Sequence, residues 1–592
     1  MMSNEKWLLK NIKADYKKLA NNFKVSELIC KIILNRNIRD PKLMDSFINP
    51  NLDKLHNPRL MKDMELGVNI MKESIHNGLK IRICGDYDQD GTSSILTLYN
   101  GLKRCGADVD YVIPHRIHDG YGINDRIMEE AKEDGIELMI TCDNGISAIE
   151  PIKFAKELGL KVIVTDHHDI PYVQNKKGEK EYFLPQGDAV INPKRLDCAY
   201  PFKELCGAGV AFKFIQVLYE EMNIKIEASY ELLEFVAMAT VCDVVDLIDE
   251  NRVIVREGLK RIHKTENLGL KALIKETGIE EKVVNTYALG FVLGPCINAS
   301  GRLESADIAV ELFLTKDPVK AEENANKLHT LNEERKAMTI SGLESVVEKI
   351  ESSELIDDKV LVVYESSIHE SIAGIIAGRV KDKYNKPSIV LTHSKEDGIA
   401  KGSARSIEEY NMFEELSKCK NLLCKFGGHP MAAGLSLEFS NIDKLRNQLN
   451  ERTTLTEDDL MPKVYIDAHV PLDKLSNDLP EQLKLLEPFG KGNRKPLFAE
   501  KGISIKKIDI LGKDYKVMKI ALVSKNGRVL TGIHFGDVDA FQGYLAEKFG
   551  QSELDRAFGG QTNNIEIDIT YLPSINEYRG TSTLQVVIQN YR

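Results

Sequence analysis

At 592 residues the chain is too long for one ordinary hydrophobic core, so we expect three or four domains. A hydrophobic content of 43% and a charged content of 29% are ordinary for a globular protein, and no apolar run approaches the ~20 residues that a membrane helix needs. The net charge of −11 argues against a protein that simply coats nucleic acid, but it is compatible with a nuclease that has a local basic track. The first residues contain no apolar signal core and the 10 cysteines form no CxxC pair, so we expect a cytoplasmic protein with no membrane partner.

Residues 1–75 are polar and have a helical pattern, and we treat them as a separate helical region. Short apolar runs then alternate with helical stretches. The runs are Ile81–Cys84, Val109–Ile113, Leu138–Cys142, Val162–Thr165 and Ala189–Ile191. This alternation predicts an α/β fold in which helices cover both faces of a parallel sheet. Because residues after 207 read as mostly helical, we expect the first large domain to span 76–316.

Three acidic elements follow three of these apolar runs. They are the loop CGDYDQDGTS with Asp86, Asp88 and Asp90, the DNG turn at Asp143, and the DHH triplet at 166–168. In open parallel sheets, ligands bind beyond the carboxyl ends of the strands. We therefore group the three elements into one site.

The acidic loop is typical of a divalent-metal site. Three carboxylates within five residues repel one another unless a multivalent cation lies between them, although single Asp residues also serve as helix caps and turn formers. Asp243, in the apolar stretch ATVCDVVDL, either caps a helix or is a further ligand. Mixed Asp and His ligands suit two cations ~4 Å apart, Mn²⁺ or Mg²⁺, and imidazole favours Mn²⁺.

The second half of the chain contains the candidate substrate-binding residues. We expect a connecting helix at 317–350, a smaller α/β domain at 351–455, and a small β-barrel built from short strands at 456–592. Gly402–Ser406 (GSARS) combines backbone amides, hydroxyls and a guanidinium suited to phosphate, and Gly427–Gly434 would allow close approach of a ligand. Each of these segments could also be an ordinary turn.

In this order, the motifs resemble those of the DHH phosphoesterase superfamily and, within it, the RecJ family of bacterial single-stranded-DNA exonucleases. DYDQDG, DNG, DHH and VCDVVDL are similar to the DHH domain. GSARS and FGGHPMAAG resemble the DHH-associated domain, and EPFGKGN with the segment from Asn576 to Ile588 resembles the oligonucleotide-binding (OB) barrel. The resemblance runs from about residue 80 to the C-terminus.

The resemblance implies two-metal hydrolysis of single-stranded DNA from the 5′ end to 5′-mononucleotides, in DNA repair and recombination. It implies the metal ligands Asp86, Asp88, Asp90, Asp143, His167 and Asp243, with Asp143 bridging the two ions. The implied catalytic residues are Asp143, His167 and His168, with His168 positioning or protonating the scissile phosphate. The implied substrate-binding residues are Arg116, Asn298, Arg302, Ser403, Arg405 and His429. The barrel would bind further nucleotides of the DNA strand through charge and base stacking.

The chain departs from the family pattern at three positions. Cys296 stands where an Arg is common, Arg494 replaces a common Pro, and Cys84 occupies a position where some superfamily members have His. None of these changes removes a metal position. Expected partners are single-stranded DNA, with a helicase and a single-strand-binding protein as further partners, and a monomer is the default state.

Two other functions remain open. A phosphodiesterase of the same superfamily, acting on short oligonucleotides or cyclic dinucleotides, would not need the C-terminal barrel. A non-catalytic scaffold, like degenerate DHH relatives of the replication helicase, predicts missing ligands.

Overall fold

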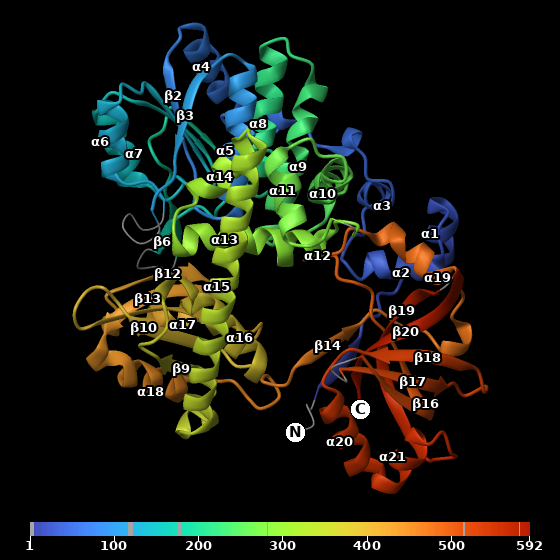
Figure 1. The fold of residues 1–592 in the computed structure, drawn as a ribbon. Coiled ribbons are helices and arrows are strands. Elements are labelled where there is room, and N and C mark those ends of the chain that lie inside the picture. Colours follow the sequence, from blue (N-terminus) through green and yellow to red (C-terminus); the bar gives the residue numbers. More distant parts are fainter. Residues whose placement is uncertain (1–4, 116–121, 175–178, 281, 513–515, 579) are drawn as a thin grey trace. The chain divides into compact units, whose positions relative to one another are not determined.

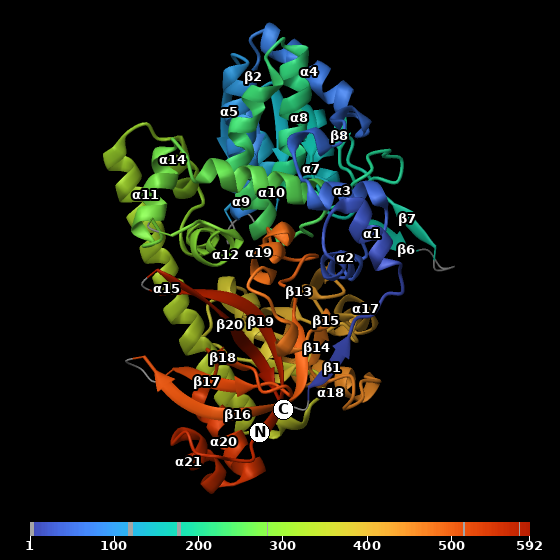
Figure 2. The same ribbon diagram turned by 90° about the vertical axis from the view of Figure 1, so that its right-hand side faces the viewer.

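The computed structural model describes residues 5–115, 122–174, 179–280, 282–512, 516–578 and 580–592 (Figures 1 and 2). The chain forms two compact units. The barrel unit comprises Met1–Leu55, Asp246–Arg256 and Pro462–Arg592, and the two-lobe unit comprises His56–Val245 and Glu257–Met461. This division differs from the predicted ranges, because most of the 1–75 region belongs with the C-terminal barrel. Within the described residues, no helix is long and apolar enough to cross a bilayer.

The first lobe of the two-lobe unit is built on a five-stranded sheet, and all its pairings are parallel, as predicted (Figure 1). In spatial order the strands are β3 (Asp108–Val112), β2 (Lys80–Cys84), β4 (Leu138–Cys142), β5 (Lys161–Thr165) and β8 (Ala189–Ile191). Side chains of α6 (Asp125–Glu133) and α7 (Ile149–Glu157) share an apolar core with Met139, Val162 and Val164. The other face is covered by α5 (Gln89–Arg104) and α8 (Gly207–Glu221).

The second lobe follows a long connecting helix, as predicted. This helix, α15 (Pro318–Glu351), begins with Pro318 at its first position and with the Asp317 side chain accepting from the backbone N–H of Val319. The lobe has a mixed sheet with the spatial order β12 (Lys425–His429), β13 (Ala432–Glu438), β11 (Ile399–Arg405), β10 (Ser388–His393) and β9 (Leu361–Tyr364). The two glycine-rich segments therefore lie largely in strands rather than in turns: GSARS ends β11, and the second segment forms the hairpin of β12 and β13.

The barrel unit contains a closed five-stranded barrel, again as predicted. Its strands run in the order β16 (Phe498–Leu511), β17 (Val517–Val523), β18 (Val529–His534), β20 (Thr581–Tyr591) and β19 (Glu566–Tyr578), and pairing of β19 with β16 closes the ring. The pairing of β18 with β20 is parallel and the others in the ring are antiparallel. This small closed barrel has the five strands of an OB-fold.

The N-terminal region contains a strand that the sequence did not predict. β1 (Lys6–Leu9) pairs in parallel with β14 (Lys463–Ile466), so Trp7 lies opposite Val464. Because its partner lies more than 450 residues away, no local periodicity marks these four residues as a strand. Helices α2 (Glu27–Leu34) and α3 (Pro41–Ile48) then pack their apolar residues into the core of the barrel unit.

One buried arginine forms hydrogen bonds with separate segments of the barrel unit. Arg252, in α10 (Asp249–Ile262), is fully buried, and its guanidinium donates to the carbonyl oxygens of Phe47 (2.9 Å), Leu485 (2.8 Å) and Leu486 (2.8 Å). Burial lowers the pKa of Arg252 to about 9. The charge is therefore balanced by main-chain dipoles from two distant stretches of chain.

We expect Arg252→Ala to lower the stability of the barrel unit by about 4 kcal/mol, because it leaves a cavity and several buried carbonyls without donors. Urea unfolding followed by tryptophan fluorescence would measure this loss, since the single tryptophan, Trp7, lies in the barrel unit. Arg556→Ala is the control, because Arg556 forms an exposed pair with Glu553 on its own helix and should change stability by less than about 0.5 kcal/mol. A loss in Arg252→Ala as small as in the control would contradict the role of Arg252.

Candidate metal centre and phosphate pocket

The carboxyl ends of three parallel strands bring the predicted acidic elements together. Asp86 follows β2, Asp143 follows β4 and His167 follows β5. Asp243 joins them from the end of α9 (Leu233–Cys242). Among the residues that the structure describes, the potential ligand atoms form three groups, each within 4.8 Å, and all six predicted metal ligands belong to them. The groups are Asp86, Asp88 and Asp143; Asp90, His167 and Asp243; and Asp143, Asp166, His167 and His168.

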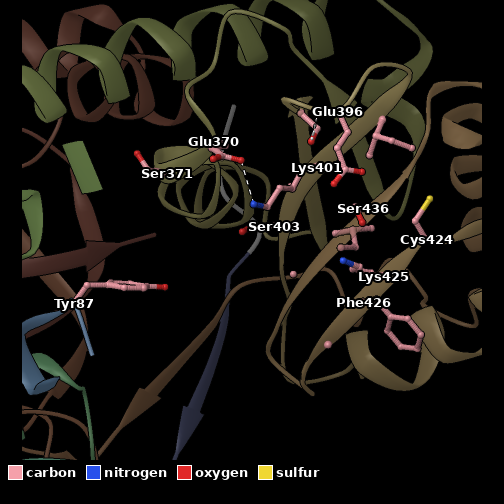
Figure 3. A pocket seen from close by; sticks show the side chains of 16 residues that line it. Tyr87, Glu370, Ser371, Glu396, Lys401, Ser403, Cys424, Lys425, Phe426 and Ser436 are labelled. Atoms are coloured by element: carbon pink, nitrogen blue, oxygen red, sulfur yellow. Dashed lines mark hydrogen bonds and ion pairs between the residues drawn. The ribbon is translucent and has the colours of Figure 1, made fainter. Parts of the chain in front are cut away.

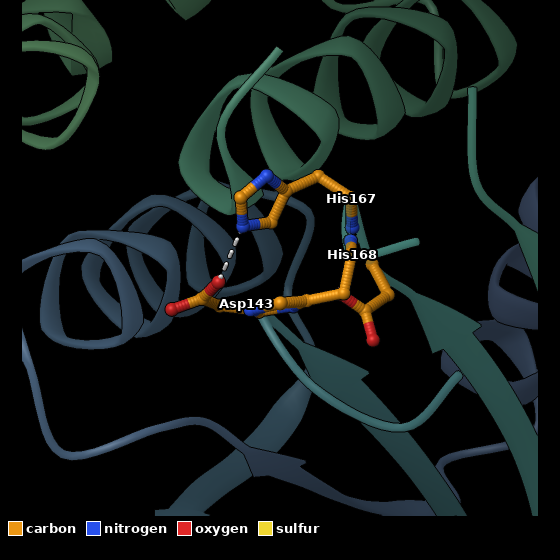
Figure 4. Close-up of side chains that lie close together, drawn as sticks. Asp143, His167 and His168 are labelled. Atoms are coloured by element: carbon orange, nitrogen blue, oxygen red, sulfur yellow. Dashed lines mark hydrogen bonds and ion pairs between the residues drawn. The ribbon is translucent and has the colours of Figure 1, made fainter. Parts of the chain in front are cut away.

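His167 lies at the centre of this arrangement. Its Nε2 is 3.0 Å from Asp143 Oδ1 (Figure 4) and 3.6 Å from Asp90 Oδ2. Its Nδ1 is 3.8 Å from Asp243 Oδ2. Burial lowers the pKa of His167 to about 3, so the imidazole is neutral at physiological pH. A neutral imidazole is the form that binds a metal.

The carboxyl groups around His167 are buried close to one another, and this disfavours their ionisation. Burial, and then the charge of neighbouring Asp90 and Asp88, raises the pKa of Asp143 and of Asp243 well above the usual range. Asp143 also adopts a left-handed backbone conformation, with φ of 59°. A divalent cation would relieve this crowding of negative charge, and mixed Asp and His donors suit such a cation. The residues present therefore fit a metal centre.

Asp88 and Asp90 also organise helix starts, so the helix-cap interpretation holds beside the metal interpretation. Asp88 Oδ1 accepts from the backbone N–H of Asp90 (2.9 Å) and Gly91 (3.1 Å) at the start of α5. Both oxygens of Asp90 accept from backbone N–H groups at the start of α8, at 2.6 and 2.8 Å. A Cβ on Gly91 would lie 2.2 Å from the Asp86 carbonyl oxygen, so only glycine allows this tight loop.

Asp166 is a site residue that we did not select from the sequence, although it opens the DHH triplet. Its Oδ1 accepts from His168 Nδ1 at 2.7 Å and from two backbone N–H groups, and its Oδ2 accepts from the N–H of Ile146 at 2.9 Å. These bonds fix the ring of His168. Although burial opposes a charge there, the Asp166 carboxylate raises the pKa of His168 to about 9. His168 is therefore an imidazolium at neutral pH, next to a neutral His167.

Asn192 is a second residue that the sequence reasoning missed. It follows β8, and its amide donates to the carbonyl oxygen of His168 at 2.9 Å. The only sequence signal was its position after an apolar run, which does not distinguish it from a turn residue.

Two predicted phosphate-binding residues meet at a helix start in the second lobe. Ser403 and Arg405 lie two residues apart on β11, and both face Gly374 near the start of α16 (Ala373–Tyr384). A Cβ on Gly374 would lie 2.9 Å from Arg405 Nη2 and 3.1 Å from Ser403 Oγ. Arg302, on α13 (Gly294–Leu303), donates to the carbonyl oxygen of Ser371 just before α16 at 2.8 Å. A helix N-terminus with these donors is suited to an anion.

The remaining predicted substrate residues are placed differently. Asn298 Oδ1 accepts from the backbone N–H of Gln89 at 2.7 Å, so its oxygen holds the metal-site loop. His429 Nδ1 is 3.5 Å from Asp169 Oδ2, with both side chains exposed, so the hairpin of the second lobe meets the residue after the DHH triplet. Arg116 lies outside the described residues. Cys296 is buried, and its Sγ contacts the Asn332 amide at 3.4 Å.

A cavity of about 770 Å³ opens over the sheet of the second lobe (Figure 3). Its lining includes Tyr87 of the metal-site loop and Ser403, Lys401, Lys425 and Phe426 of the second lobe. The Lys401 ammonium is 3.1 Å from the Glu370 carboxylate. The cavity is thus lined both by the loop of the candidate metal site and by the strand that carries the predicted phosphate-binding residues.

Three family models match consecutive parts of the chain. The DHH family N-terminal domain matches residues 80–240, the DHHA1 domain residues 357–454, and the RecJ OB domain residues 466–590. The single-stranded-DNA-specific exonuclease RecJ of Haemophilus influenzae is 31% identical over 96% of this chain and 97% of that protein. The chain belongs to the RecJ family.

Two further RecJ proteins resemble the chain. RecJ of Bacillus subtilis is 39% identical over 81% of this chain, but the match spans only 59% of that protein. The crystal structure of Thermus thermophilus RecJ in complex with Mn²⁺ has a TM-score of 0.80 and 24% identity, and the match covers 100% of this chain and 80% of that one. This structural match supports the fold of DHH, DHH-associated and OB domains expected for a RecJ protein.

We expect Asp143→Asn to stabilise the metal-free protein at neutral pH, because it removes one charge from the crowded carboxylates. The folded-state pKa of Asp143 is raised, so the stability cost is absent below the unfolded value of about 4, grows as the pH rises above that value and is complete above the folded-state pKa. The gain should therefore be largest near pH 8 and should vanish as the pH falls towards 4.

Thermal melting in EDTA across this pH range would measure the effect of Asp143→Asn. Asp397→Asn, at an exposed turn, is the control and should give no pH-dependent gain. A pH-independent change in the Asp143 variant would show that charge crowding is not its cause.

Proposed function

We propose that the chain is a metal-dependent exonuclease that degrades single-stranded DNA from the 5′ end and releases 5′-mononucleotides. The observation that carries this proposal is that Asp143 belongs to two of the ligand groups at the sheet edge, within a protein of the RecJ family. The enzyme acts in the cytoplasm, in DNA repair and recombination. A helicase and a single-strand-binding protein would supply and protect its substrate, and it works as a monomer.

We assign two ions, Mn²⁺ or Mg²⁺, to this set of donors. Asp86 and Asp88 would hold one ion, Asp90, His167 and Asp243 the other, and Asp143 would bridge them. When bound, such a pair supplies Lewis-acid stabilisation of charge on phosphate oxygens and lowers the pKa of water. In its neutral form the His167 ring has one nitrogen without a hydrogen, which can bind an ion, and one N–H, which can donate to a neighbouring carboxylate.

His168 would act on the scissile phosphate as a cation. Its ring is fixed through Nδ1 by Asp166, and its raised pKa keeps it protonated at neutral pH. A phosphodiester is anionic throughout hydrolysis and gains charge in the transition state, so a fixed imidazolium stabilises it and can donate a proton to an oxygen.

The pocket at the start of α16 would determine that hydrolysis begins at the 5′ end of the strand. Ser403 and Arg405 face this helix start, and Arg302 is tied to Ser371 beside it. A terminal 5′-phosphate carries more negative charge than an internal phosphate and would bind there, placing the next phosphodiester at the metal centre. The OB barrel would hold the following nucleotides by charge and stacking.

The deciding experiment uses an oligodeoxynucleotide labelled at its 3′ end, beside a blunt duplex and a dinucleotide. With Mn²⁺ we expect the single strand alone to shorten from its 5′ end, and EDTA or Asp143→Ala to abolish the reaction with the fold retained. Activity that persists in Asp143→Ala would overturn the metal-centre assignment. Cleavage confined to the dinucleotide would favour the phosphodiesterase alternative, and absence of both cleavage and Mn²⁺ binding would favour a scaffold.

We expect Arg405→Ala to raise KM for 5′-phosphorylated single strands about tenfold, equivalent to about 1.4 kcal/mol, while 5′-hydroxyl strands change little. Steady-state kinetics on the two substrates would measure this difference. Lys418→Ala, which removes an exposed pair with Glu415, is the matched cationic control. An equal loss on both kinds of end would contradict a 5′-phosphate role.

A further inference from the structure

The cavity over the sheet of the second lobe continues past the residues that would bind a terminal phosphate. Figure 3 shows Tyr87 on one side of it, and Lys425 and Ser436 on the opposite side. Ser403 lies between these two sides. A strand that leads from the metal-site loop to a 5′-monophosphate at Ser403 and Arg405 would therefore reach only the nearer part of the cavity. The part beyond Ser403 has room for a group attached to that phosphate.

Glycines form the floor of the cavity beside Ser403. Gly434 of β13 lies opposite Ser403 of β11, and Gly427 of β12 lies opposite Gly434. A Cβ at either glycine would meet no atom within 4 Å, so this row of the sheet is open backbone with space above it. An anion can approach such a surface closely, because no side chain intervenes.

The next row of the sheet, two residues or ~7 Å further along β11, carries two lysines on the same face as Ser403. Lys401 lies opposite Ser436 of β13, which lies opposite Lys425 of β12. The Lys401 ammonium is 3.1 Å from the Glu370 carboxylate. The exposed Lys425 ammonium forms no hydrogen bond or ion pair with any residue in the described parts of the chain. This row therefore offers two ammonium groups with a hydroxyl between them.

The chemistry of this far part suits phosphate better than a base. Phe426 points away from the face that carries Lys425, and its ring lies 5.8 Å from Phe413 beside the apolar core of the lobe. It is therefore not an open platform for stacking. Glu396, exposed at the rim, has no ion pair with a described residue, and its charge weakens the site for anions.

We propose that the enzyme also degrades single strands whose 5′ end carries a triphosphate, with the two outer phosphates bound by Lys401, Lys425 and Ser436. This inference rests on the proposed function, because the innermost phosphate would occupy the pocket at Ser403 and Arg405. The open glycine backbone between the two rows would allow the phosphate chain to cross from one to the other.

The reaction on such an end is the same hydrolysis with a different first product. The oxygen of water bonds to the phosphorus of the first phosphodiester, and the bond from that phosphorus to the 3′ oxygen of the terminal nucleotide breaks. The 3′ oxygen gains the proton that water loses. The phosphoanhydride bonds stay intact, so the terminal nucleotide leaves as a nucleoside 5′-triphosphate and the shortened strand has a 5′-monophosphate.

The test compares 3′-labelled oligodeoxynucleotides of one sequence that carry a 5′-monophosphate or a 5′-triphosphate, with Mn²⁺ in excess over phosphate. Only the first cleavage reports on the triphosphate, so it is followed in single turnovers, with anion-exchange chromatography of the released nucleotide. We expect the wild type to release nucleoside triphosphate. Lys425→Glu should slow this first cleavage about tenfold at subsaturating enzyme and change cleavage of the monophosphate end less than about twofold. Glu396→Gln should accelerate cleavage of the triphosphate end.

The control is Lys444→Glu, which reverses an exposed lysine of the same lobe outside the cavity and should leave both rates unchanged. Melting curves followed by circular dichroism check that every variant is folded. Cleavage of monophosphate ends but not of triphosphate ends by the wild type would overturn this inference and leave the proposed function standing. Lys425→Glu with no loss, or with an equal loss on both ends, would also overturn it, as would release of a monophosphate and pyrophosphate. Failure of the wild type on both ends would contradict the proposed function itself, and this inference with it.

Discussion

The repulsion among buried carboxylates around His167 is the constraint on which the rest of the first lobe depends. Asp143 and Asp243 are kept near Asp90 and Asp88 at the edge of a parallel sheet, where burial makes each charge costly. A fold tolerates such a cluster only if the surrounding backbone over-determines it. Here the cluster is fixed by strand ends, by two helix starts and by the left-handed residue Asp143.

The same fold gives two adjacent histidines different protonation states at neutral pH. His167 lies among carboxylates but is buried, so it stays neutral, whereas His168 is bonded directly to Asp166 and stays protonated. The difference arises from where each ring points and not from the sequence around it. One short motif thereby places a neutral and a protonated imidazole side by side, as the proposed roles of metal ligand and phosphate-binding cation require.

Contacts between the two lobes connect the metal centre to the phosphate pocket. Arg302 reaches the helix start of the second lobe, and Asn298 on the same helix holds the metal-site loop. The hairpin that carries His429 meets Asp169, the residue after the DHH triplet. A single helix, α13, therefore relates the place where an anion would bind to the place where a phosphodiester would be cut.

The sequence by itself determined the parallel sheet, the connecting helix, the small barrel and the grouping of the acidic motifs at the sheet edge. These follow from local periodicity and from the rule that ligands lie at the carboxyl ends of parallel strands. Only the tertiary structure decided that Asn298 binds a backbone N–H, that Asp166 orients His168, and that β1 pairs with β14. Each of these depends on the direction of a side chain or on a partner distant in the chain, and neither quantity leaves a periodic signal in the sequence.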